Sequence, residues 1–209
     1  MDSIDIKRLR GILNAMAEKI ITNRDHLNDV DAGIGDADHG TGMAQSFAKA
    51  RDKLAASQEN DTAAVLLKAF GSGIMGGGGG ASGALFSGIY LEGAKAIAGK
   101  SELYPTDIAA WWRAGLEVVK SRGKATPGDK TMVDALEPAV KALEDNASRG
   151  LADQALAALE AARAGVEATK NMVAGQGRSR YAGERSLGQQ DAGATSVALL
   201  FESLAENIK

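Results

Sequence analysis

The sequence lacks cysteine, is poor in aromatic residues and has no block of basic residues. Without cysteine, disulfide bonds and thiolate chemistry are excluded. Aromatic residues make up 4% of the 209 residues and hydrophobic residues 44%, so the core must consist mainly of aliphatic side chains and alanine. Such small side chains allow helices to pack closely, because the distance between helix axes depends on the side chains at the contact.

Charge and hydropathy exclude two classes of partner. The formal net charge is -3, with 24 Lys and Arg against 27 Asp and Glu, whereas a nucleic-acid partner would require a basic face. No apolar run reaches the roughly 18 residues of a membrane span. The polar, acidic start is unlike a signal peptide. We therefore expect a cytoplasmic protein that binds neither nucleic acid nor membrane.

Helical periodicity runs through almost the whole chain. Apolar residues lie three and four positions apart, which predicts helices with one apolar face. About eight helices are expected, over residues 6–20, 43–54, 62–70, 85–97, 105–119, 132–143, 151–172 and 197–204. No segment alternates apolar and polar residues as a half-buried strand would. The sequence therefore predicts an all-α fold with a single domain over residues 1–209.

Four residues give local expectations within these helices. Thr62 and Ser82 precede apolar helical patterns and are expected to be N-caps. Pro138 lies inside or restarts its helix, where it removes one backbone hydrogen bond and favours a kink. Trp111 and Trp112 are adjacent, so at most one of them is expected to point fully inward.

The most unusual stretch is acidic and covers residues 31–40. Asp31, Asp36 and Asp38 are separated only by Gly, Ala and Ile, and His39 follows directly. Carboxylates this close repel one another when ionised, and a cation relieves the repulsion. Mg²⁺ binds through one or two carboxylates together with substrate phosphates. The stretch indicates either a Mg²⁺-phosphate site or a solvated acidic turn, and alone it does not separate the two.

Three other loops are rich in glycine or charge. The five glycines at 76–80 fit a linker, or a phosphate-binding turn at a helix N-terminus. They do not form a Walker A loop, because no GxxxxGK[ST] pattern occurs. The segment 122–131 fits a surface turn or a ligand-binding loop. The segment 174–193 carries three arginines, which bind phosphate bidentately, and is unusually long for a compact domain.

His39 also has two interpretations. Beside an aspartate, histidine is more often a local hydrogen-bonding residue than a catalyst. A Ser-His-Asp hydrolase finds little support, because no serine lies in a nucleophile-elbow pattern.

Taken together, these motifs resemble the nucleotide-binding L subunit of dihydroxyacetone kinase. The motifs are GDADHG at 35–40, GGASG at 79–83, SRGKATPGDKTM at 121–132 and GRSRYAGERSLGQQDAGATS at 177–196. They occur in the family's order and spacing over nearly the whole chain. The resemblance implies an antiparallel eight-helix barrel that binds ADP or ATP and two Mg²⁺ at one end.

The resemblance also implies roles for individual residues. Asp31, Asp36 and Asp38 would hold the two Mg²⁺, and Arg178 would act on the phosphates as a catalytic residue on a lid. The implied nucleotide-binding residues are His39, Gly40, Thr41, Gly42, Ala81, Ser82, Gly123, Met132, Arg178, Asp191, Ala192 and Gly193. Some members of the family have Asn at the position of Gly42 and Pro at that of Ala192, so the nucleotide affinity of this chain could differ from theirs.

The implied activity is phosphoryl transfer to dihydroxyacetone held on a separate K subunit, so the chain would be a kinase subunit active only with its partner. The donor would be a phosphohistidine M subunit of the sugar phosphotransferase system acting on bound ADP, or else exchangeable ATP. Three alternatives stay open: a tetrose acceptor such as erythrulose, a fatty acid on a carrier protein, or a nucleotide-sensing module without turnover. A homodimer is also left open.

Overall fold

The computed structural model describes residues 3–59 and 61–208, which form nine α-helices and one 3-10 helix. In chain order the helices are α1 (Ile6–Thr22), α2 (Arg24–Ala32), α3 (His39–Ala55), α4 (Ala63–Gly76), α5 (Gly80–Ala96), α6 (Pro105–Gly123), α7 (Val133–Asp145), α8 (Leu151–Thr169), η1 (Ser179–Ser186) and α9 (Ala192–Asn207). Within the described residues there is no strand, only an isolated bridge between Ile4 and Leu103. The all-α prediction is confirmed.

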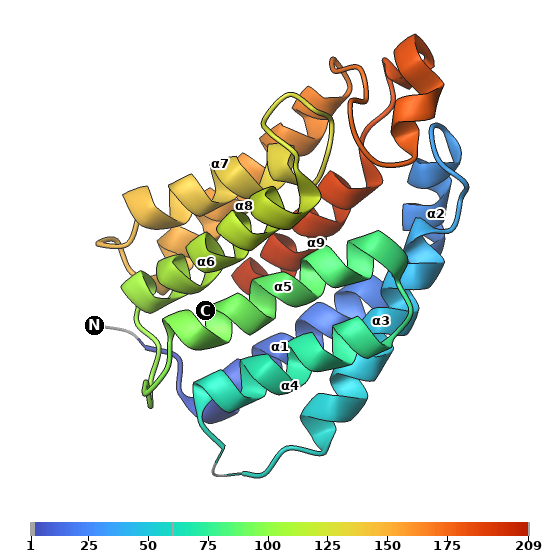
Figure 1. Ribbon diagram of the computed structural model, residues 1–209. Helices are drawn as coiled ribbons and strands as arrows, with labels where there is room; N and C mark the ends of the chain where they lie inside the picture. The colour runs from blue at the N-terminus through green and yellow to red at the C-terminus, as the bar shows by residue number, and fades with distance from the viewer. Residues whose placement is uncertain (1–2, 60, 209) are drawn as a thin grey trace.

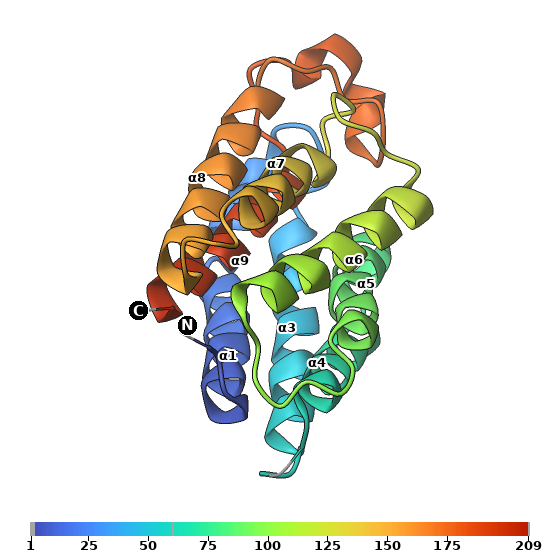
Figure 2. The same cartoon turned by 90° about the vertical axis from the view of Figure 1, so that its left-hand side faces the viewer.

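Eight of the helices close into a ring. Each of α3, α4, α5, α6, α7, α8 and α9 packs against the next, and α9 packs against α1, which returns to α3. Figures 1 and 2 show these helices surrounding a common core, with α2 at one end beside α3. The arrangement is the eight-helix barrel that the resemblance implied, with α2 as an additional helix.

The up-and-down course of the chain places four loops at the same end of the barrel. These are the loops that precede α3, α5, α7 and α9, and Figure 1 shows them at the upper right with η1 above them. Each of these helices therefore begins at this end. Since the N-terminus of a helix carries a partial positive charge, four such termini favour an anionic ligand there.

The first predicted helix, over residues 6–20, is observed as α1 and ends at Thr22, and α2 begins directly after Asn23. The Asn23 side chain donates a hydrogen bond to the Lys19 carbonyl at 2.8 Å, and its backbone leaves the α-helical region (φ -94°, ψ 15°). An asparagine that bonds to nearby backbone competes with the regular helix ladder. The chain therefore turns at this residue, and α2 carries Asp31 in its last turn rather than on the loop.

The core contains a cluster of aromatic rings in the middle of the barrel. Trp111 and Trp112 are both fully buried, so the prediction that at most one would point inward is wrong. The reason is that α6 packs between α5 and α7. Trp112 lies 4.4 Å from Phe201 between ring centroids. Gly93 of α5 makes room for Trp111, because a Cβ there would lie 1.9 Å from the Trp111 Cδ1.

Other local predictions have mixed outcomes. Thr62 caps α4 as expected, with its side chain accepting a hydrogen bond from the Val65 amide. Ser82 is not an N-cap, because α5 begins at Gly80 and its cap is Gly79. The Ser46 hydroxyl of α3 accepts the Gly79 amide at 3.1 Å and so fixes the residue that precedes the first turn of α5. Helix α7 runs through Pro138 from Val133 to Asp145.

Two further observations complete the fold. The long loop after α8 is not without structure, since it contains η1. Among the described residues, no helix combines the length and the apolar character needed to cross a membrane.

Candidate nucleotide and metal site

Three carboxylates meet where α2 ends and α3 begins. One oxygen from each of Asp31, Asp36 and Asp38 lies within 4.8 Å of the others, with Asp31 half-buried and the other two exposed. Gly35 allows the loop to fold over Asp31, because a Cβ at this position would lie 2.1 Å from the Asp31 Oδ1. Ala37 has φ 59°, an unfavourable value for a residue with a side chain. The loop therefore brings the predicted ligands together.

The Asp31 carboxylate also holds the start of α3. Its Oδ2 accepts the backbone amides of Asp38 at 3.1 Å and His39 at 3.4 Å. A carboxylate so fixed keeps its remaining lone pairs aimed at the space beside Asp36 and Asp38. Three hard oxygen donors from carboxylates are the type of ligand that Mg²⁺ takes, so the residues present fit this ion.

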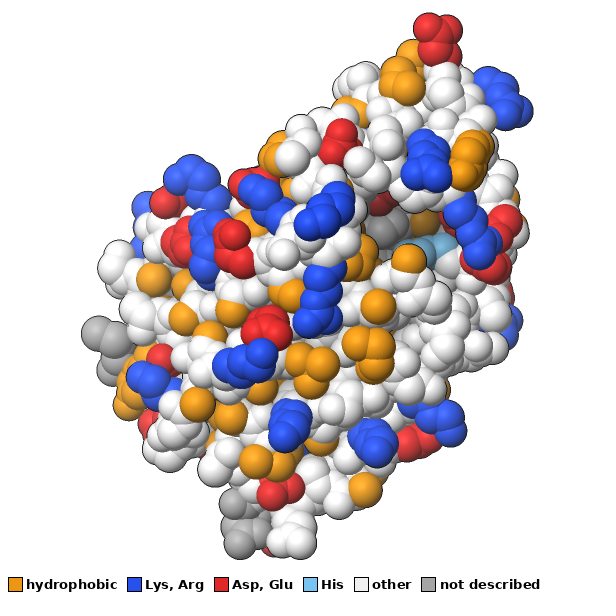
Figure 3. Space-filling model, viewed as in Figure 1, with side chains coloured by type: hydrophobic (Ala, Val, Ile, Leu, Met, Phe, Trp, Pro, Cys, Tyr) orange, Lys and Arg blue, Asp and Glu red, His pale blue; other side chains and the backbone are white. Residues whose placement is uncertain are grey.

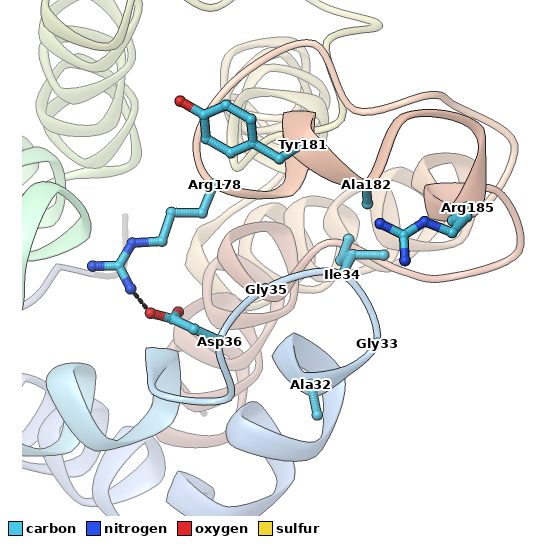
Figure 4. A pocket seen from close by; sticks show the side chains of 9 residues that line it. All are labelled: Ala32, Gly33, Ile34, Gly35, Asp36, Arg178, Tyr181, Ala182 and Arg185. Carbon is cyan, nitrogen blue, oxygen red and sulfur yellow. Dashed lines mark ion pairs between the residues drawn. The ribbon is translucent and has the colours of Figure 1, made fainter.

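A guanidinium group lies against the same carboxylates. Arg178, which directly precedes η1, forms an ion pair with Asp36, and its Nη1 lies 3.4 Å from the Asp38 Oδ2 (Figure 4). The guanidinium of Arg178 occupies carboxylate lone pairs of Asp36 that a metal ion would use. Arg178 and a metal ion therefore compete for Asp36. The structure brings together all three predicted metal ligands and the predicted lid arginine.

His39 joins this cluster to α9. Its Nε2 lies 2.8 Å from the Ser196 hydroxyl, which itself donates to the Ala192 carbonyl at 3.1 Å. The hydroxyl proton is therefore engaged, so Nε2 donates to Ser196. Burial lowers the pKa of His39, while the Asp31 carboxylate opposes this shift. A neutral, fixed imidazole fits the role of a nucleotide neighbour.

The residues after His39 pack closely against α2 and the glycine turn. A Cβ on Gly40 would lie 2.0 Å from the Arg24 carbonyl oxygen. Thr41 exchanges two hydrogen bonds with the Asn28 side chain, at 2.9 and 3.0 Å. A Cβ on Gly42 would lie 3.3 Å from the Gly79 Cα. The start of α3 is therefore held between α2 and the turn before α5.

The glycine turn is ordered around the start of α5 and is not a linker. Gly78 and Gly80 have positive φ values of 82° and 58°. Ala81 and Ser82 lie in the first turn of α5, with Ala81 exposed and Ser82 half-buried. Their backbone amides belong to the N-terminal turn, where free N–H groups bind anions.

The remaining predicted residues lie on α6, α7 and α9. Gly123 is the last residue of α6 and packs beside Leu85 of α5. Met132 is buried just before α7, and a Cβ on Gly193 would lie 3.3 Å from the Met132 Cβ. The structure thus brings Met132 and Gly193 together. Gly123, in contrast, lies beside α5.

Asp191 and Ala192 form the start of α9. The Asp191 carboxylate accepts the Ala194 amide at 2.7 Å as a helix N-cap, and Ala192 is buried. Burial raises the pKa of Asp191 to about 7, and the hydrogen bond from Ala194 opposes the shift. The half-buried Asp191 belongs to the frame of the site.

A pocket of about 550 Å³ opens between the acidic loop and η1. Its lining residues are Ala32, Gly33, Ile34, Gly35, Asp36, Arg178, Tyr181, Ala182 and Arg185 (Figure 4). The space-filling view shows the molecule hollowed at this end, with a histidine side chain visible inside the hollow (Figure 3). Phosphate-sized groups can therefore approach the carboxylates and the arginine from solvent.

Sequence reasoning missed several residues that shape the site. Ser46 and Ser196 are buried hydroxyls that hold Gly79 and His39, and Lys130 is fully buried behind the loop before α7. Ser46 and Ser196 are polar residues on otherwise apolar helix faces, which was the available signal. Lys130 lies within the third quoted motif but was assigned no role.

Comparisons with known proteins identify relatives of this chain. The DAK2 domain model matches residues 33–206. The ADP-binding subunit DhaL of a PEP-dependent dihydroxyacetone kinase of Escherichia coli is 39% identical over 186 residues, 88% of each chain. A subunit of the same description from Listeria innocua is 35% identical and covers 93% of this chain and 92% of its own.

A solved structure adds the fold. The dihydroxyacetone kinase from C. freundii in complex with AMP-PNP and Mg²⁺ is 28% identical, with a TM-score of 0.77 over 99% of this chain. This chain spans 35% of the length of that protein. Since the family model and the bacterial relatives both cover most of the sequence, the chain belongs to the DAK2 domain family.

Proposed function

We propose that this chain is the ADP-binding subunit of a dihydroxyacetone kinase and that its DAK2 domain extends over residues 1–209. The observation that carries the proposal is the meeting of Asp31, Asp36, Asp38 and Arg178 at the barrel end where four helices begin. The high identity to bacterial ADP-binding subunits over most of both chains supports the same assignment.

Asp31, Asp36 and Asp38 would hold the two Mg²⁺ of a bound nucleotide. Mg²⁺, when bound, neutralises charge on a transferring phosphoryl group. Asp31 would stay in place because two backbone amides bind it. Arg178 would leave Asp36 and bind phosphate oxygens, which suits a planar group with paired donors. The chain then supplies positioning and charge neutralisation, which phosphoryl transfer requires.

The other predicted residues would surround the nucleotide. The amides at the start of α5, at Ala81 and Ser82, would bind phosphate oxygens, and Gly40, Thr41 and Gly42 would lie beside the nucleotide. His39, whose pKa is lowered by burial and whose ring is held by Ser196, would touch the nucleotide. Gly123, Met132, Asp191, Ala192 and Gly193 would form the wall around the adenosine.

The acceptor and the donor would come from partner subunits. Dihydroxyacetone would be held by a K subunit, and a phosphohistidine M subunit would rephosphorylate the bound ADP. The protein would then act in the cytoplasm. Exchangeable ATP is the alternative donor. A tetrose such as erythrulose is the alternative acceptor, and a sensing module without turnover is the alternative outside catalysis.

One reconstitution separates these possibilities. The purified chain is combined with a K subunit and dihydroxyacetone, and either phosphorylated M subunit or ATP is added while the triose phosphate is measured. Product is expected with the M subunit, together with ADP and Mg²⁺ retained by the purified chain in native mass spectrometry. Product with ATP alone would identify ATP as the donor. No product with either donor, despite nucleotide binding, would favour a sensor.

Arg178→Ala tests the lid assignment. We expect transfer to fall by about tenfold to a hundredfold, while the affinity for resting ADP changes less, because the arginine is needed most where charge develops. Transfer kinetics and ADP titration measure the two effects. Equal losses in both would contradict the assignment.

A further inference from the structure

Lys130 is a buried cation outside the predicted site. Its side chain is fully buried, and its backbone has φ 59°, in the left-handed region. Lysine is almost never fully buried unless it is paired. Strained backbone is retained where the surroundings impose it, most often near functional sites. Both features call for a role that an ordinary turn residue does not have.

The Lys130 ammonium joins the two ends of one segment. We call residues 170–190, between α8 and the cap of α9, the lid. The ammonium donates to the carbonyl of Thr169, the last residue of α8, at 2.5 Å, and to the carbonyl of Gln189. A cation at the C-terminus of α8 also faces the negative end of the helix. One side chain from the loop before α7 therefore fixes where the lid leaves the barrel and where it returns.

Other hydrogen bonds also form where the two ends of the lid meet the barrel, a region that we call the lid base. The Gly188 amide donates to the Lys170 carbonyl at 2.8 Å, and the Gly175 amide donates to the Asp129 carbonyl at 3.0 Å. The Asp191 amide donates to the Thr169 hydroxyl at 3.0 Å. Burial lowers the pKa of Lys130, and the Asp134 carboxylate, together with Asp191 when it is ionised, opposes this shift. Lys130 is the cationic centre of this base.

The lid itself is held by an internal bond pattern. The buried Ser186 hydroxyl accepts the Ala174 amide at 2.9 Å and donates to the Gly183 carbonyl at 2.6 Å. Arg178 and Tyr181 lie toward its exposed side, where Arg178 reaches Asp36 (Figure 4). A segment folded on itself takes its position from its base, so a change at the base moves Arg178.

We propose that Lys130 is a positioning residue for phosphoryl transfer, which clamps both ends of the lid and thereby sets the place of Arg178 over the acidic loop. Its kinetic consequence rests on the proposed function, whereas the clamp itself does not. Lys130 touches no reacting group and acts through Arg178.

A double-mutant cycle tests the link to Arg178 in the complex with the K subunit. We expect K130M to lower the transfer rate by about tenfold, since small misplacements of a catalytic group have effects of this size. In the Arg178→Ala background, K130M should add less than about twofold, because effects on a shared pathway are not additive. Full multiplication of the two losses would overturn the proposal.

Two variants control for general damage. K170M changes a lysine that also lies at the lid base, where its ammonium pairs with Glu167 on the surface of α8. Its rate should stay within about twofold of wild type. K130Q keeps a donor without the charge and serves where K130M does not fold. A K130Q protein with wild-type rate and wild-type lid protection would overturn the proposal.

Limited trypsin digestion gives a readout that needs no catalysis. The lid offers Arg178, Arg180 and Arg185 as cleavage sites, and proteolysis reports the population of the open segment. We expect cleavage there to be about tenfold faster in K130M than in wild type or K170M, at equal melting temperature. Unchanged cleavage would overturn the proposal that Lys130 clamps the lid. If the wild-type complex transfers no phosphoryl group, the proposed function is rejected, and the trypsin digestion alone tests whether Lys130 clamps the lid.

Discussion

The middle of the barrel and its loop end differ in how they use side chains. In the middle, Trp111 and Trp112 are fully buried and pack on Tyr90 and Phe201. At the loop end, carboxylates face one another, and the described non-glycine residues with positive φ, Ala37, Lys124 and Lys130, all lie in its loops. Strain and like charges reduce stability. The middle therefore supplies the stability that allows the loop end to keep an unfavourable arrangement.

Truncating the aromatic cluster should cost the most stability. We expect Trp112→Ala to lower the free energy of unfolding by about 3–5 kcal/mol, because a large buried side chain leaves a cavity. Urea denaturation measures this loss, and ADP titration of the folded fraction should give wild-type affinity. Leu156→Ala is the control, since this side chain is half exposed. If folded Trp112→Ala protein loses affinity for ADP, the barrel middle does not act on stability alone, and the contrast between the two regions is contradicted.

Removing one carboxylate from the loop end should reduce activity and leave stability nearly unchanged. We expect Asp36→Ala to reduce phosphoryl transfer to below about 1% of wild type, because a metal ligand is lost. Its helical content should be unchanged, and its unfolding free energy should stay within about 0.5 kcal/mol, because an exposed ion pair contributes little. Circular dichroism and the reconstituted assay measure both. Asp25→Ala, an exposed acid in the first turn of α2, is the control. Full activity of Asp36→Ala would refute the metal assignment.

Asp191 should make the stability of the loop end depend on pH. Its pKa is raised to about 7 by burial, whereas an unfolded aspartate has a pKa of about 3.9. Between these values the folded protein holds a proton that the unfolded chain releases. The free energy of unfolding should therefore fall as pH rises from about 4 to 7 and level off above, with a total change on the order of 4 kcal/mol.

Asp191→Asn tests this dependence, because asparagine can still cap α9 but does not ionise in this range. Urea denaturation between pH 4 and 8 should show that the excess slope of wild type disappears in the variant. Asp153→Asn, at an exposed position in the first turn of α8, should retain the wild-type slope. Parallel curves for Asp191→Asn and wild type would contradict the assignment.

The smallest expected effect concerns Ala192. It is the first residue of α9, and the preceding Asp191 is extended, with φ -82° and ψ 132°. Proline is favoured at this helix position and after such a residue. We expect Ala192→Pro to raise the free energy of unfolding by about 0.5–1 kcal/mol, measured by thermal denaturation. Ala194→Pro should destabilise, because the Ala194 amide binds the Asp191 carboxylate. A destabilised Ala192→Pro would show that α9 does not begin as described.

Much of the fold could be predicted from the three- and four-residue spacing of apolar positions, because that pattern is local. The break at Asn23 was missed, since it depends on one side-chain bond to Lys19. The start of α5 was misplaced because the Ser46 hydroxyl that holds Gly79 comes from another helix. Two helices of correct periodicity do not reveal such a contact.

In the candidate site, too, some residues could be predicted from the sequence and others could not. Asp31, Asp36 and Asp38 were chosen because like charges separated by small residues indicate a cation site, and the structure places them together. Their binding of Mg²⁺ stays a prediction. Lys130 was passed over because its partner Gln189 is 59 residues away in the chain.

The sequence by itself determined which face of each helix is apolar, and it placed four motifs in four loops. Only the tertiary structure decided that both Trp111 and Trp112 are buried, that Arg178 reaches Asp36, and that Lys130 joins the ends of the lid. Periodicity reports the environment of a helix relative to its own axis. The closing of eight helices into a ring decides what lies on every other side, and this depends on contacts between residues far apart in the chain.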